Sequence, residues 1–134
     1  MQVIVDTGYL VALLRERDEH HAWAAGLASN LELPLLTCEA VLAEAAFHLQ
    51  SSVYLLQMVR SGVVQVAFDC SRNVIELLEL ANRYADRHPD LADLCLIRMS
   101  ELHPRHSVIT VDEADFRIYR RNKRDVIPLI CPPR

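Results

Sequence analysis

The chain has 134 residues, 51% of them hydrophobic, and a net charge of −4 at neutral pH. This composition predicts a single domain over residues 1–134 with a substantial core, and it excludes a disordered chain. The mild acidity excludes a general attraction to nucleic acid or membranes, and no apolar run approaches the ~20 residues of a transmembrane helix. The N-terminus lacks a signal-type segment and the four cysteines form no Cys-x-x-Cys pair, so we expect a cytoplasmic protein with reduced thiols and no zinc site.

Strand-like and helical segments alternate along the chain. The first run of β-branched residues predicts a buried strand, and Asp6-Thr7 is a suitable cap for a helix that follows. The expected strands are residues 2–5, 33–37, 63–66, 107–111 and 126–130. The further expected helices are residues 18–30, 38–50, 52–60, 71–84 and 91–101. This alternation predicts an α/β fold with a parallel sheet covered by helices on both faces.

Four carboxylates stand at separated positions that this fold would bring together. Asp6 and Asp112 follow strand-like runs directly, whereas Glu44 and Asp93 lie in helical segments with apolar neighbours, where an exposed acid is unusual. Chain that leaves the carboxyl end of a strand opens into the crevice where α/β proteins bind ligands. The resulting negative pocket is unfavourable unless protons or a cation neutralise it, and hard divalent cations prefer oxygen ligands.

Each acid also has a simpler interpretation when it is considered alone. Asp6 is a good helix N-cap, and Glu44 could be a solvated helix residue. Asp112 and Asp115 could be turn residues, and Glu39 could favour a helix N-terminus without joining a site. Asp93 is less easily explained by capping, because Asp90 after Pro89 is the better cap.

The order of these acids and their flanking residues resembles PIN-domain ribonucleases, most closely the VapC type of toxin–antitoxin systems. The matching segments are residues 5–10, 37–44, 91–97 and 109–116. Each segment alone is common, but all four in the family's order are specific; one departure is Leu94, where the family often has alanine. The resemblance implies a three-layer α/β/α fold with a five-stranded parallel sheet. It also implies endonucleolytic cleavage of RNA, with Mg²⁺ or Mn²⁺ at the four acids.

The chemistry of phosphodiester hydrolysis suggests how these residues divide the work. One or two divalent ions can activate water and neutralise the phosphate, and Mg²⁺ takes only one or two direct carboxylates. We expect Asp6 and Asp93 to bind metal directly, and Glu44 and Asp112 to bind it directly or through water. Thr110 and Asp115 are expected in supporting roles, and Glu39 is a further candidate. The six histidines lack the spacing of a metal site and are interpreted as surface or packing residues.

A cluster of positive charges follows the last acids. It allows two interpretations: a solvated helix face, or an arm that contacts RNA phosphates. Its members are Arg117, Arg120, Arg121, Lys123 and Arg124.

The leading hypothesis is therefore a metal-dependent endoribonuclease that acts as a toxin and is silenced by a cognate antitoxin protein. A homodimer is expected through the apolar segments around Trp23 and Tyr54 to Met58. The alternatives are a PIN nuclease with a housekeeping role in RNA processing, or a non-catalytic PIN-fold binding module. A phosphatase is disfavoured because Gly8 stands where an Asp-x-Asp motif would need its second acid.

Overall fold

The computed structural model describes residues 1–134, and its centre is a five-stranded sheet. The strands are β1 (Val3–Val5), β2 (Leu35–Thr37), β3 (Val64–Val66), β4 (Ser107–Ile109) and β7 (Leu129–Ile130). They lie in the order β3-β2-β1-β4-β7, and every neighbouring pair is parallel. The carboxyl ends of β1 and β4, the two strands followed by predicted site acids, therefore lie side by side at the same edge.

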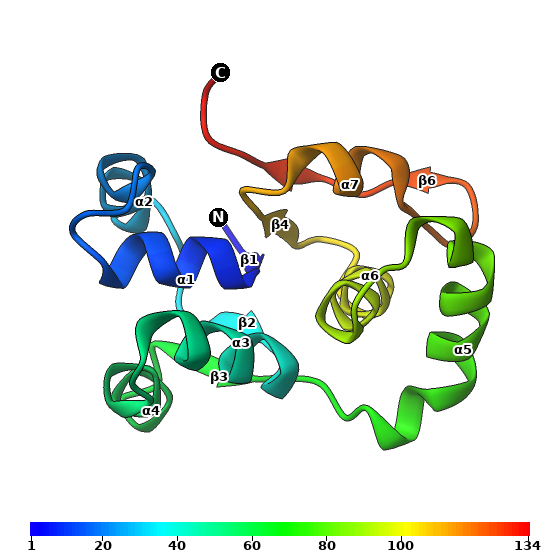
Figure 1. Ribbon diagram of the computed structural model, residues 1–134, viewed down its shortest axis with the longest axis horizontal. Helices are drawn as coiled ribbons and strands as arrows, with labels where there is room; N and C mark the ends of the chain where they lie inside the picture. Colours follow the sequence, from blue (N-terminus) through cyan, green and yellow to red (C-terminus); the bar gives the residue numbers. More distant parts are fainter.

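Seven α-helices complete a three-layer α/β/α arrangement (Figure 1). They are α1 (Thr7–Leu14), α2 (His21–Ala28), α3 (Glu39–Leu49), α4 (Val53–Arg60), α5 (Val74–Arg83), α6 (Leu91–Leu102) and α7 (Glu113–Ile118). Two short 3₁₀ helices, η1 (Ser71–Asn73) and η2 (Ala85–Arg87), flank α5. A small antiparallel pair, β5 (Arg120–Arg121) and β6 (Asp125–Val126), follows α7. The longest helix, α6, has 12 residues, and none of the helices has the length and apolar character of a membrane span.

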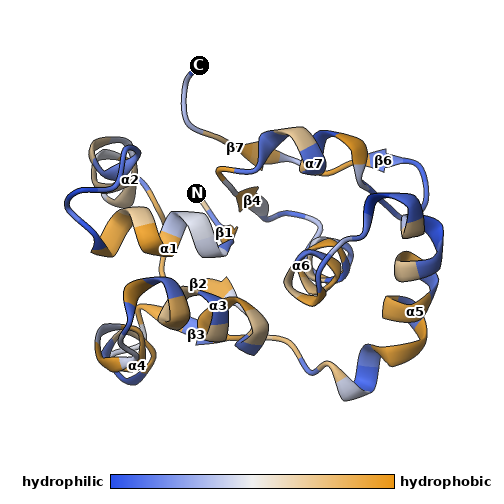
Figure 2. Cartoon of the chain, viewed as in Figure 1, coloured by the Kyte–Doolittle hydropathy of each residue, from blue (hydrophilic) through white to orange (hydrophobic).

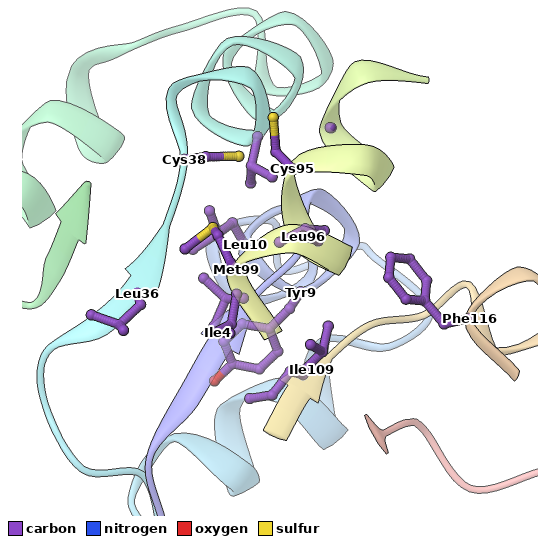
Figure 3. Close-up of a cluster of buried hydrophobic side chains, with 14 of the residues drawn as sticks. Ile4, Tyr9, Leu10, Leu36, Cys38, Cys95, Leu96, Met99, Ile109 and Phe116 are labelled. Atoms are coloured by element: carbon purple, nitrogen blue, oxygen red, sulfur yellow. The ribbon is translucent and has the colours of Figure 1, made fainter. Parts of the chain in front are cut away.

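The core lies between the sheet and the helices that follow its strands. All three residues of β1 are completely buried, as expected for a central parallel strand. Figure 3 shows Ile4 of β1 and Ile109 of β4 close to Leu10 of α1 and Leu96 of α6. In Figure 2 the strand β2 and much of α1 are hydrophobic, whereas the chain around β6 is hydrophilic. This packing fixes α1 and α6, which begin beside two of the predicted site acids.

The predicted parallel sheet is confirmed, but the segment from 126 to 130 is not one strand. Val126 belongs to the β5–β6 hairpin, and the sheet resumes only at Leu129. Pro128, which has no backbone N–H, separates the two pieces, although its carbonyl still accepts a hydrogen bond from the Val108 N–H at 2.8 Å. One predicted strand is therefore divided between two sheets.

The basic cluster is not a helix face, so that interpretation was wrong. Arg117 lies near the end of α7, whereas Arg120 and Arg121 form β5. Asn122 and Lys123 have φ angles of 50° and 71°, and these left-handed residues turn the chain back into β6. The positive charges are thus spread over a helix end and a hairpin.

Candidate active site

A cleft of about 590 Å³ opens at the carboxyl ends of β1 and β4, and all four predicted catalytic acids line it. Asp6 arrives from the end of β1 and Asp112 from the loop after β4. Glu44 lies in the middle of α3, and Asp93 lies in the first turn of α6. The structure therefore brings together the four acids that the sequence placed on four separate elements.

Asp6 is the most enclosed of these acids, with 7% of its surface exposed. Its Oδ2 accepts a hydrogen bond from the Thr110 hydroxyl at 2.7 Å, and its Oδ1 accepts one from the Thr7 N–H at 2.6 Å. Burial raises the pKa of Asp6 to about 6, against the opposing effect of these two hydrogen bonds, and the charges of Glu44 and Asp112 add to the rise. A carboxylate at this position thus gains from any cation that enters the cleft.

Asp93 has an even stronger tendency to keep its proton. Burial, followed by the charges of Asp90 and Asp6, raises its pKa to about 8. Asp90 caps α6 by accepting a hydrogen bond from the Asp93 N–H at 2.9 Å. The Tyr119 hydroxyl donates to Asp93 Oδ2 at 3.2 Å, and burial together with the charge of Asp93 raises the pKa of Tyr119. Tyr119 is therefore held as a hydrogen-bond donor that orients Asp93.

Two threonines connect the remaining acids to the scaffold. The Thr7 hydroxyl donates to Glu44 Oε2 at 3.1 Å and so links the start of α1 to the middle of α3. The Thr110 hydroxyl, while donating to Asp6, accepts a hydrogen bond from the Asp112 N–H at 2.9 Å. Desolvation and the charge of Asp115 raise the pKa of Asp112. Thr110, predicted to have a supporting role, thus touches two of the four acids.

The donor set suits a hard divalent cation. One carboxylate oxygen from each of Asp93, Asp112 and Asp115 lies within 4.8 Å of the others. Carboxylate oxygens are the ligands that Mg²⁺ and Mn²⁺ prefer. Burial and, after it, the charges of neighbouring acids raise the pKa values of Asp93 and Asp112, so a cation that enters here would favour their charged forms. Asp115, expected only in support, belongs to this closest group, whereas Asp6 does not.

Glu39 does not join the other acids. It begins α3 and is exposed beside a separate, largely apolar cavity that Cys38 and Phe68 also line. Its position in the first turn of α3 matches the simpler interpretation, an acid that interacts favourably with a helix N-terminus.

The structure adds cleft residues that the sequence analysis did not single out. Arg15 and Arg87 line the cleft, and the Arg87 guanidinium donates to Asp115 Oδ1 at 2.9 Å. The structure also shows why position 8 is a glycine: a Cβ there would overlap Cγ2 of Val111, in the loop that leads to Asp112. No local pattern in the sequence pointed to Arg15, Arg87 or Tyr119 as cleft residues.

The predicted basic cluster lies outside the cleft lining. Arg117 pairs with Glu113 at 3.1 Å, and the Arg120 guanidinium donates to the carbonyl of Arg117 at 2.6 Å. Arg121 donates to the Ser100 carbonyl at 3.2 Å and so anchors the hairpin to α6. Lys123 and Arg124 are exposed and form no ion pair within the chain.

Comparison with known protein families gives an independent result. The family model of the PIN domain matches residues 3–124, which include all four predicted catalytic acids. No curated protein matches the chain. PIN domains are generally nucleases, and a cleft with clustered carboxylates is compatible with that chemistry. The chain therefore belongs to the PIN domain family.

Proposed function

We propose that this protein is a metal-dependent endoribonuclease that hydrolyses phosphodiester bonds in RNA. Asp6, Glu44, Asp93 and Asp112 are its catalytic acids, and Asp115 completes the site. The observation that carries the proposal is the convergence of these acids from separate elements into one cleft, with three carboxylates close enough to share a cation. The family match supports the nuclease class.

The side chains divide into those that would hold a cation and those that orient them. Asp93, Asp112 and Asp115 would hold Mg²⁺ or Mn²⁺, which when bound supplies an activated water and neutralises charge on the phosphate. Thr110 fixes Asp6, Thr7 positions Glu44, and Tyr119 engages one oxygen of Asp93 while leaving the other free. Asp6 and Glu44 would then accept hydrogen bonds from water in the cleft.

More specifically, we propose that the nuclease is the toxin of a toxin–antitoxin pair and acts in the cytoplasm. Its support is the resemblance of residues 5–10, 37–44, 91–97 and 109–116 to the VapC type. The cognate antitoxin would be a protein that blocks the cleft. We propose one domain over residues 1–134, because a single buried cluster extends from Val3 to Ile127. A housekeeping RNA-processing nuclease is the alternative, and a non-catalytic binding module is disfavoured by the complete acidic set.

A homodimer is part of this proposal, with a surface on α3 and α4. The patch consists of Phe47, Val53, Tyr54 and Leu56, and Phe47 is 79% exposed. Trp23 is a weaker candidate, because it is partly buried and packs edge-on against Tyr9 with ring centroids 6.0 Å apart.

Sequencing of RNA ends after induced expression tests the proposed function in cells. The wild-type chain should create a discrete set of new RNA ends within minutes, and an Asp6→Asn variant expressed at the same level should not. Growth arrest that a small neighbouring gene product relieves would favour the toxin over a housekeeping nuclease. Identical RNA ends with both chains, after circular dichroism shows that both fold, would contradict the proposal.

A further inference from the structure

Two arginines line the acidic cleft from opposite sides. Arg15 follows the C-terminal end of α1, and Arg87 ends η2 in the chain between α5 and α6. In Figure 1 these two segments lie to the left and to the right of the adjacent ends of β1 and β4. No other lysine or arginine lines the cleft, whereas eight carboxylate side chains do.

We propose that Arg15 and Arg87 form a clamp that binds the RNA phosphates on either side of the phosphate to be cleaved. This inference rests on the proposed function, and it names the residues that hold the substrate. A cleft with this excess of acids repels a polyanion, so cations at its rim are needed to hold the flanking phosphates. The arginines of the basic cluster are less suitable, because Arg117, Arg120 and Arg121 lie outside the cleft lining.

Arg87 is held ready for this role by an acid of the candidate metal group. Its side chain is 32% exposed, and its guanidinium pairs with Asp115 Oδ1 at 2.9 Å. A divalent cation shared by Asp93, Asp112 and Asp115 would take over the charge compensation of Asp115 and repel the guanidinium. The released guanidinium stays at the cleft rim, where its planar fork matches two phosphate oxygens.

Arg15 is fixed on the other side by the backbone. Its guanidinium donates to the carbonyl of His48 in α3. This contact uses only part of the five N–H donors of the guanidinium. Arg15 is nine positions after Asp6 in the sequence, so it lies roughly 13 Å along the axis of α1 from the first acid. At the ~3.4 Å spacing per nucleotide of a duplex strand, that is about four nucleotides, and fewer in an extended single strand. Arg15 would therefore bind a phosphate within the same short stretch of RNA.

The test compares single variants in a background that leaves RNA intact. Glu44→Gln is combined with Arg15→Ala, Arg87→Ala or Arg87→Lys, and fluorescence anisotropy measures binding of a 12-nucleotide single-stranded RNA in Mg²⁺ over a range of salt. Each alanine variant should weaken binding about 3- to 10-fold and flatten the log–log salt slope by roughly 0.7. Arg87→Lys should keep the slope, because the charge remains, but recover only part of the affinity.

Arg105→Ala is the matched control, since it removes the same charge from an exposed turn before β4, at the opposite edge of the sheet. It should change neither the affinity nor the salt slope.

Mn²⁺ binding, measured by calorimetry without RNA, gives a second readout. Arg87→Ala should bind Mn²⁺ more tightly, because a competing cation has been removed from Asp115; a purely structural Arg87 would give unchanged or weaker binding.

The possible outcomes distinguish failure of the Arg15–Arg87 clamp from failure of the proposed nuclease function. If the wild-type chain cleaves RNA but both alanine variants keep the wild-type salt slope, the clamp is wrong and the nuclease stands. If Lys123→Ala or Arg124→Ala flattens the salt slope of RNA binding and the Arg15 and Arg87 variants do not, the RNA contact lies on the hairpin and the clamp is wrong. If the wild-type chain neither cleaves nor binds RNA with any divalent cation, the proposed function itself fails.

Discussion

Asp6 and Asp93 keep their protons to higher pH than ordinary carboxyl groups, because burial and neighbouring acids penalise their charged forms. Their pKa values of about 6 and about 8 lie above 3.8, the ordinary value. Protons therefore bind the folded chain more tightly than the unfolded one. The stabilisation from this difference is complete below about pH 4 and is lost as pH rises through 6 and 8.

Because the pKa of Asp93 is raised in the folded chain, we expect the metal-free protein to become less stable between pH 5 and pH 8.5, relative to an Asp93→Asn variant. The amide cannot ionise, so the difference in free energy of unfolding between variant and wild type should grow in the variant's favour as pH rises. Urea denaturation in EDTA at several pH values measures this difference, and other titrating groups cancel. Saturating Mg²⁺ should shrink it, whereas a difference independent of pH would contradict the raised pKa of Asp93.

Thr110 offers a test of how an acid is positioned. Thr110→Val removes the hydroxyl that donates to Asp6 and accepts from the Asp112 N–H, while Thr110→Ser keeps it. We expect the valine variant to lose roughly 10- to 100-fold in metal affinity or activity, the usual range when a hydrogen-bond partner that orients the side chains of a metal site is removed. The serine variant should stay within a few-fold of wild type. Equal Mn²⁺ affinities for the two variants would show that the hydroxyl is dispensable.

The candidate acids were predictable from the sequence to different degrees. Asp6 and Asp112 follow strands, and the parallel sheet places both at one edge, so their convergence follows from the strand pattern. Prediction of Glu44 and Asp93 as site acids depended on the family resemblance as well as on their apolar sequence neighbours. Tyr119 and Arg87 reach the cleft from segments whose course depends on tertiary packing, and no local pattern encodes that.

At the level of elements, the close approach of α1 to the loop after β4 depends on Gly8. A methyl group there would overlap Val111 Cγ2; Gly8 lies two residues after Asp6, and Val111 directly precedes Asp112. We expect Gly8→Ala to destabilise the fold by about 1–3 kcal/mol, the usual range for overpacking, and to lower RNA cleavage by separating Asp6 from Asp112. Thermal denaturation and cleavage assays measure the two effects.

The double variant Gly8→Ala with Val111→Ala is the control for this prediction. Shortening Val111 makes room for the new methyl group, so part of the lost stability and activity should return. A single Gly8→Ala variant with wild-type stability and activity would mean that the loop moves aside freely.

The elements that the sequence did not predict are the short ones. Helix α7 spans six residues and buries only Phe116, which is too little for a helical period to show. The β5–β6 hairpin turns at Asn122 and Lys123 without the Asn-Gly pair that signals such turns. Longer helices with several buried residues, such as α6, were predicted within a residue or two.

On the scale of the whole molecule, alternation of strands and helices predicted a parallel sheet but not its order. The fully buried β1 lies at the centre, between β2 and β4, while its neighbours in space come from distant parts of the chain. Strand order depends on how the crossovers pack, and the pattern of each segment does not contain that information. The family resemblance supplied the three-layer architecture that the structure confirms.

The apolar patch on α3 and α4 leads to a prediction about assembly. Tyr54 and Leu56 are 63% and 62% exposed, so Leu56→Lys should raise the dimer dissociation constant at least about tenfold. Sedimentation velocity at micromolar concentration measures this. Leu78→Lys on α5, which changes another exposed leucine, should leave the dimer intact. A wild-type chain that sediments as a monomer would contradict the dimer.

The most direct test of the central claim is cleavage of RNA by the purified chain with and without divalent cations. Wild type and the surface variant Asp86→Asn, whose acid lies outside the cleft lining, should cleave single-stranded RNA in Mg²⁺ or Mn²⁺ and stop in EDTA. Asp93→Asn should fold and lose at least about 100-fold in rate, because a carboxylate at the centre of the site is gone. Cleavage in EDTA at the same rate, or a folded Asp93→Asn variant as fast as wild type, would contradict the account.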